Sequence, residues 1–112
     1  MKRVLLLFVF VASFILASGQ VKPWEAIAIK VSNKMKDTLS LSESTHGQIY
    51  FINWQLGRDK SMIWQEYSGS DSLIRYHLQR LENMRDSLYL PILGEEKFSI
   101  YRQKKTNLIS NF

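Results

Sequence analysis

Apolar residues recur at steps of three and four along most of the chain, which is the spacing of amphipathic α-helices. The first such segment begins at Pro23, a residue that fits the first turn of a helix. Its apolar stripe consists of Trp24, Ile27, Ala28, Val31, Met35 and Leu39. The spacing predicts a helix near residues 23–38.

A second helix is predicted near residues 43–67, because Ser42 followed by Glu43 is typical of a helix start. Its narrow apolar stripe consists of Ile49, Ile52, Leu56, Ile63 and Tyr67. Three aromatic residues lie outside this stripe: Tyr50, Phe51 and Trp54. The helix is thus apolar over more than half its circumference, which predicts a second contact, either within a small bundle or with a dimer partner or client. Gly57 is expected at a bend or a close helix crossing.

The third predicted helix, near residues 72–89, follows a compact turn at residues 68–71. Its expected apolar face consists of Leu73, Ile74, His77, Leu81, Met84 and Leu88. Glu82 and Arg85 are three residues apart, a spacing that favours an ion pair on a helix. Pro91 disfavours helical geometry at the preceding residue, so this helix is expected to end or kink by Leu90.

A shorter fourth helix is predicted near residues 95–109, opened by Gly94 and two glutamates. Its apolar side consists of Phe98, Tyr101, Leu108 and Ile109. Beyond the first twenty residues, no segment longer than three or four residues alternates as a strand does. The expected fold is all-α, a small bundle or cradle of about four amphipathic helices, formed by a single domain of residues 20–112.

The N-terminus has the organisation of a secretory signal peptide. Lys2 and Arg3 precede an uncharged run from Val4 to Ala17, and small residues follow at positions 17–19. We expect residues 1–19 to be the signal peptide and cleavage to occur before Gln20. The alternative is an uncleaved anchor, which needs about 20 apolar residues to cross a bilayer. The predicted location is periplasmic or secreted, with no stable membrane span after cleavage.

Composition narrows the function classes further. The chain has 112 residues, 22% of them charged, no cysteine and a net charge of +5. Without cysteine there is no disulfide and no lipid anchor on a mature N-terminal cysteine. The charges are mixed in sign along the chain, which argues against a nucleic-acid partner. A domain of this size without disulfide or metal is marginal as a lone monomer, so a homodimer or another partner is expected.

The sequence shows no reaction centre, so a non-enzymatic protein is expected. It has neither a cysteine nor a G-x-S-x-G nucleophile, and its two histidines are His46 and His77. We expect His77 to be a hydrogen-bonded core histidine. Glu43 and His46 share a helix face, but two ligands are too few for a specific metal site. We therefore predict no metal and no cofactor.

Two helix starts share a sequence pattern: residues 41–45, Leu-Ser-Glu-Ser-Thr, and residues 93–98, Leu-Gly-Glu-Glu-Lys-Phe. This pattern resembles the LTXXQ motif family of exported helical proteins, the Spy and CpxP type, in which a Leu-Thr-x-x-Gln pair begins two helices of a cradle. Ser42 and Gly94 stand at the threonine positions, and Thr45 and Lys97 at the glutamine positions. Serine and glycine both serve as helix caps.

The resemblance implies an ATP-independent periplasmic chaperone or an envelope-stress accessory protein, usually dimeric. The partners it implies are unfolded or envelope proteins. The client- or partner-binding surface is then assigned to Tyr50, Phe51, Trp54, Arg58 and Met62. Methionine and aromatic groups adapt to varied apolar shapes, while Arg58 and Lys60 attract acidic chains. The alternative is a structural or regulatory subunit with one dedicated envelope partner.

Overall fold

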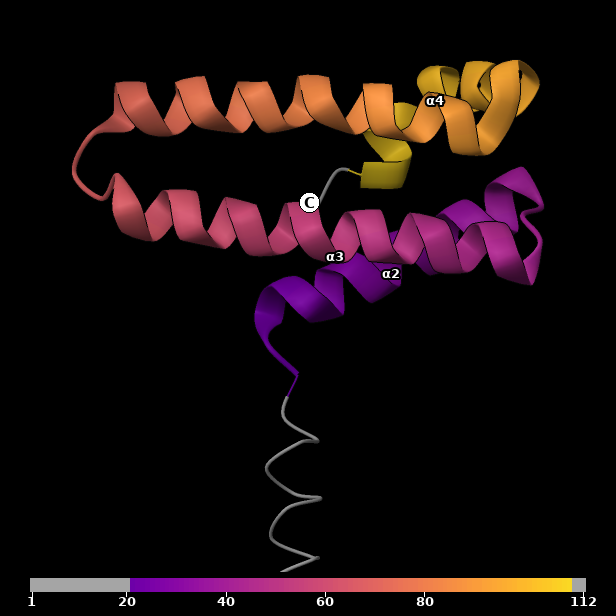
Figure 1. The fold of residues 1–112 in the computed structure, drawn as a ribbon, viewed down its shortest axis with the longest axis horizontal. Helices are drawn as coiled ribbons and strands as arrows, with labels where there is room; N and C mark the ends of the chain where they lie inside the picture. The colour runs from indigo at the N-terminus through magenta and orange to yellow at the C-terminus, as the bar shows by residue number, and fades with distance from the viewer. Residues whose placement is uncertain (1–20, 110–112) are drawn as a thin grey trace, which may run out of the picture.

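A computed structural model describes residues 21–109 of the chain and contains three helices (Figure 1). They are α2 (Pro23–Leu39), α3 (Glu43–Glu66) and α4 (Asp71–Ile109). No residue in the range 21–109 belongs to a strand, so the all-α class is confirmed. The predicted count of four helices is not, because the third and fourth predicted helices are the two arms of one bent helix, α4.

The predicted signal peptide, residues 1–19, lies outside the described residues. Within residues 21–109, none of the helices combines the length and the apolar character that a membrane crossing requires.

Helices α2 and α3 form a hairpin joined by a short connection. Helix α2 ends where Ser40 adopts a left-handed conformation, with φ of 55°. Helix α3 begins immediately afterwards, because the hydroxyl of Ser42 accepts a hydrogen bond from the backbone N–H of Thr45 (3.2 Å). This confirms the predicted cap and the predicted start at residue 43. The chain reverses here, so that α3 runs back beside α2 (Figure 1).

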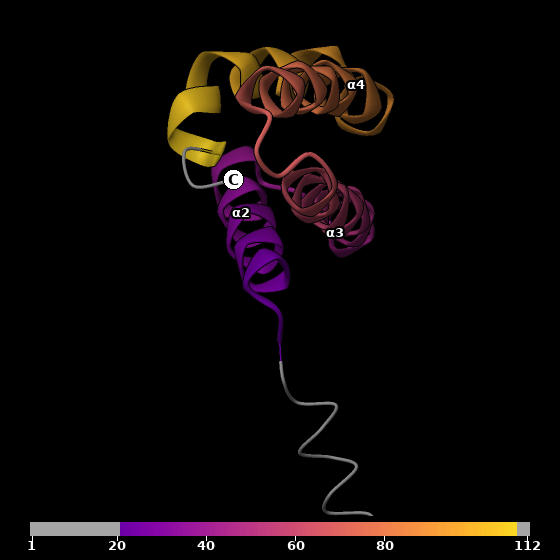
Figure 2. The ribbon, with the colours of Figure 1, turned by 90° about the vertical axis from the view of Figure 1, so that its left-hand side faces the viewer.

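Helix α4 continues through Pro91 and breaks at Gly94, so the predicted end at Leu90 is wrong by a few residues. Gly94 has φ of 79° and ψ of 166°, a conformation open essentially to glycine alone. The second arm of α4 then folds back toward α2 (Figures 1 and 2). The ammonium of Lys97 donates to the carbonyl of Ser40 (3.0 Å), and that of Lys34 donates to the carbonyl of Asn107 (2.6 Å).

The core differs from the sequence-based expectation on α4. Its buried stripe contains Ile74 and Leu81, as predicted, but continues through Arg85 and Tyr89. Three of the predicted core residues are exposed instead: Leu73, Met84 and Leu88. The buried residues recur at steps of seven and four positions, and each of the exposed ones directly precedes a buried residue in the sequence. The periodicity of apolar residues thus grouped exposed and buried positions of α4 into one predicted core face.

His77 is also not a core residue. It is half-buried, and its ring stacks on Tyr67 with centroids 4.4 Å apart. The ring of Tyr76 meets it edge-on at 5.1 Å. Because aromatic packing at the edge of the α3–α4 seam accounts for this histidine, it has a structural role.

A polar network joins all three helices inside the core. Asn53 is fully buried, and its amide donates to the hydroxyl of Ser32 at 2.8 Å. The amide oxygen of Asn53 accepts from the hydroxyl of Tyr89. Arg85, only 2% exposed, donates to that same hydroxyl (3.3 Å) and forms the predicted ion pair with Glu82 (3.2 Å). Each buried polar side chain in this network therefore has a partner.

This core predicts a loss of stability at alkaline pH. Burial raises the pKa of Tyr89, and burial together with the hydrogen bond to Asp86 raises the pKa of Tyr101. In the unfolded chain tyrosine ionises near pH 10, so the stabilisation is complete below pH 10 and is lost as the pH rises above it. Thermal melting followed by circular dichroism should show a falling midpoint above pH 10. In Tyr101→Phe, which leaves the lysines to titrate as before, the fall should be smaller; an equal fall contradicts the assignment.

Candidate functional site

Large apolar side chains gather where the start of α2 meets α3, away from the core. The rings of Trp24 and Trp54 pack edge to face, with centroids 5.2 Å apart and an interplanar angle of 70°. Phe51, Met62 and Trp64 are each more than half exposed, at 58%, 54% and 54%. Trp24, Arg58, Met62 and Trp64 line two hollows here, Trp54 packs on Trp24, and Phe51 lies one turn before Trp54 on α3. We name this surface, with all six residues, the tryptophan groove. Exposed apolar side chains that cluster in this way indicate a contact surface.

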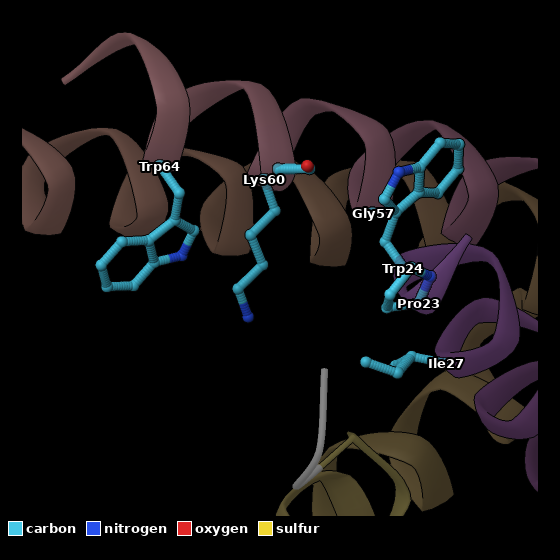
Figure 3. A pocket seen from close by; sticks show the side chains of 7 residues that line it. Pro23, Trp24, Ile27, Gly57, Lys60 and Trp64 are labelled. Atoms are coloured by element: carbon cyan, nitrogen blue, oxygen red, sulfur yellow. The ribbon is translucent and has the colours of Figure 1, made fainter. Parts of the chain in front are cut away.

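The first hollow of the groove lies between the start of α2 and the second half of α3 and has a volume of about 330 Å³ (Figure 3). Trp24, Ile27 and Trp64 supply most of its apolar lining. Lys60 of α3 is seen between Trp64 and Trp24, with its side chain extending away from the helix (Figure 3). The lining of the hollow is thus mainly apolar and includes one cationic residue, Lys60.

Gly57 gives this hollow its shape. A side-chain carbon at position 57 would lie 3.2 Å from the carbonyl oxygen of Trp24 and 3.4 Å from its ring. The absence of a side chain therefore lets the first turn of α2 approach α3 closely. This confirms the close helix crossing that the sequence predicts at Gly57.

A second hollow, of about 460 Å³, lies on the other side of Trp24 and is more polar. Lys22, Arg58, Met62 and Gln65 line it. The guanidinium of Arg58 lies over the ring of Trp54 at 5.4 Å, and the ammonium of Lys22 lies 5.8 Å from the centre of the Trp24 ring. Such cation–π contacts hold the cations beside the aromatic surface. Among the described residues that line the two hollows there is no carboxylate.

The five residues predicted for the binding surface are brought together in part. Phe51, Arg58 and Met62 are exposed, and Trp54 is half-buried against Trp24. Of the five, only Arg58 and Met62 line a hollow, and the half-buried Tyr50 makes no ring contact with the three described tryptophans.

Two residues of the groove were not in the predicted set. Trp24 was assigned to the core stripe of the first helix, but it is half-buried and separates the two hollows. Trp64 lies seven residues after Gly57, two helical turns further on the same side of α3. Trp64 also lies fourteen residues after Tyr50, nearly four helical turns, so continuing that side of α3 leads to Trp64 from the sequence. Trp24 can be assigned to the groove only from the packing of α2 on α3.

The other side chains that could bind a metal ion or take part in catalysis have structural partners. Glu43 forms an ion pair with Lys36, which lowers the pKa of the Glu43 carboxyl. A ring nitrogen of His46 lies 3.0 Å from the amide oxygen of Asn33. Across residues 21–109 no three histidine, aspartate or glutamate side chains are grouped as ligands for a metal ion.

The described residues thus define a small all-helical protein whose distinguishing feature is an aromatic groove with a positive rim. No protein-family model, curated protein sequence or solved structure matches the chain. The resemblance to the LTXXQ motif family stays a prediction from the sequence pattern.

Proposed function

We propose that this chain is an exported helical binding protein that holds apolar segments of partly unfolded proteins without ATP. The observation that supports this function is the tryptophan groove, an exposed set of aromatic and methionine side chains beside Lys22, Arg58 and Lys60. The fold and the cap at Ser42 are compatible with the LTXXQ motif family, which we propose as its relatives.

The chemistry of the groove suits a transient binder. Its hollows, of about 330 and 460 Å³, each match one or two large side chains of a client. Burying two such side chains contributes roughly 3–6 kcal/mol, and the entropic cost of association offsets much of this. Binding is therefore weak for any one segment. The cations favour segments with Asp or Glu beside the apolar residues and accelerate the encounter.

Location and assembly are part of the same proposal. Export to the periplasm or the medium follows from the signal-like residues 1–19, and the proposed partners are unfolded envelope proteins. A homodimer would carry two grooves, and two grooves that engage one client strengthen weak binding by avidity.

The test of this function is suppression of aggregation. Two unrelated proteins are denatured and diluted, and light scattering is followed with and without the purified protein, in the absence of ATP. We expect scattering to fall with both clients at near-equal molar ratio. The double substitution of Phe51 and Trp54 by serine should abolish the suppression while the helical circular dichroism is retained.

The matched control is Tyr76→Ser, because Tyr76 is a 64% exposed aromatic residue on α4, away from the groove. This variant should suppress aggregation as well as the unmodified protein does. Equal loss in both variants, or unfolding of the Phe51/Trp54 variant, contradicts the assignment of the groove. No suppression by a folded protein would favour the alternative function, a subunit with one dedicated envelope partner.

A further inference from the structure

The first arm of α4, residues 71–93, carries a second exposed apolar surface, separate from the tryptophan groove. Five large apolar side chains of this arm are between 37% and 64% exposed: Leu73, Tyr76, Met84, Leu88 and Leu90. Four further exposed residues lie between or beside them: Arg80, Asn83, Ser87 and Pro91. At 100° per residue all nine fall on one half of the helix, beside the buried stripe. We name these nine residues the α4 outer face.

The α4 outer face is almost free of charge. Arg80 is its one charged residue. The other charged residues of the arm lie outside the face: Asp71, Arg75, Glu82, Arg85 and Asp86. Tyrosine, methionine and arginine are enriched in the cores of protein–protein interfaces, whereas aspartate, glutamate and lysine are depleted there. The face therefore has the composition of an interface and not that of an ordinary solvated helix side.

The size of the face suits contact between two small proteins. Since a large side chain presents about 150–250 Å² in full, the five apolar side chains together expose roughly 450 Å². Patches of this size are often functional. With the polar residues between them, two such faces bury about 1,000–1,200 Å² in total, close to the lower limit for a specific interface. This area predicts a reversible association with a dissociation constant in the micromolar range.

The spacing of the face fits a second copy of the same helix that runs in the opposite direction. Tyr76 and Leu88 lie six residues on either side of position 82, and Arg80 and Met84 lie two residues on either side of it. A two-fold axis at this level places Tyr76 of each copy against Leu88 of the other, and Arg80 against Met84. The aliphatic stem of Arg80 then packs on a flexible thioether.

The charge of Arg80 distinguishes this orientation from a parallel one. In a parallel pair of helices each Arg80 would lie directly against its counterpart, and the two like charges would repel each other. In the antiparallel pair the two residues are offset by four positions, about 6 Å along the axis. The face is therefore complementary to an antiparallel copy of itself.

We propose that two copies of this chain associate through the α4 outer face as an antiparallel dimer with two-fold symmetry. This assigns a surface to the homodimer of the proposed assembly, but it does not rest on client binding. The tryptophan groove is formed by α2 and α3, whereas the face belongs to α4 (Figure 1). A monomeric variant keeps a complete groove, so failure of dimerisation and failure of client binding are observed separately.

Sedimentation velocity tests the association, with protein isolated from cells that express the whole chain and studied from about 1 to 200 μM. We expect a monomer–dimer equilibrium. Met84→Lys should weaken it at least ten-fold, because the symmetric contact then contains the new cation twice, each time beside Arg80 of the other copy. Leu88→Lys is a second variant with the same expected direction. The matched control is Met62→Lys, at an exposed methionine of α3, and it should leave the equilibrium unchanged.

The absence of cysteine from the chain allows single cysteines to report the orientation. Tyr76→Cys and Leu88→Cys are treated with a short bis-maleimide, each alone and as a mixture. The antiparallel dimer should cross-link only in the mixture, because the two copies of position 76 lie about 18 Å apart along the axis. Cross-linking of each variant by itself, or equal weakening by Met84→Lys and Met62→Lys, would overturn the proposal. A monomer at every concentration would also overturn it and leave the face to a different protein.

Discussion

Asn53→Ala is expected to lower the free energy of unfolding by about 3 kcal/mol, a large share of the stability of a domain this small. Asn53 is fully buried and bonds to Ser32 on α2 and to Tyr89 on α4. Its truncation removes two hydrogen bonds, leaves two buried hydroxyls with one partner fewer, and opens a small cavity. Each buried group that loses its bond costs about 1–3 kcal/mol.

Urea unfolding followed by circular dichroism measures this loss. Asn83→Ala is the matched control, because Asn83 is exposed and makes its hydrogen bond, of 3.1 Å, to Gln79 on the surface. Its cost should stay below about 0.5 kcal/mol. A double-mutant cycle with Tyr89→Phe should then show a coupling energy of about 1 kcal/mol or more between positions 53 and 89. Equal losses in the Asn53 and Asn83 variants would show that the network adds nothing.

The polar network also explains why the helices were easier to predict than their packing. The bounds of α2 and α3 lie within one residue of the predicted 23–38 and 43–67, because apolar spacing and the Ser42 cap act locally. The inner stripe of α4 was harder, since it passes through Arg85. Tyr89 and Glu82 help to stabilise the buried arginine, and this arrangement is not visible in the spacing of apolar residues.

The same reasoning applies to the site. The excess of aromatic surface on α3 identified Tyr50, Phe51 and Trp54 as residues outside the core stripe, and none of the three is buried. A helix pattern shows which side chains share a face, but it does not show which element covers that face. Trp24 covers Trp54 because Gly57 lets α2 approach, and that approach depends on the crossing of two helices. Tertiary geometry therefore decided the limits of the groove.

Gly94→Ala is expected to destabilise the protein by about 1–3 kcal/mol. Space is not the cause, because no atom lies within 4 Å of the position that a side-chain carbon would occupy. The cause is the backbone: at φ of 79° and ψ of 166° an L-alanine is strained, and relief of that strain straightens the bend of α4. A straighter α4 pulls the second arm away from α2 and separates Tyr101 from Tyr89, whose rings lie 5.0 Å apart.

Gly47→Ala is the matched control, because it makes the same chemical change with the opposite expected sign. Gly47 is exposed within α3, its φ is not positive, and no atom lies within 4 Å of the added carbon. Alanine there should stabilise the protein by about 0.5–1 kcal/mol through helix propensity. Urea midpoints that move in opposite directions in the two variants would show that the bend at Gly94 holds the fold together. Midpoints that both rise would mean that α4 is as stable straight as bent.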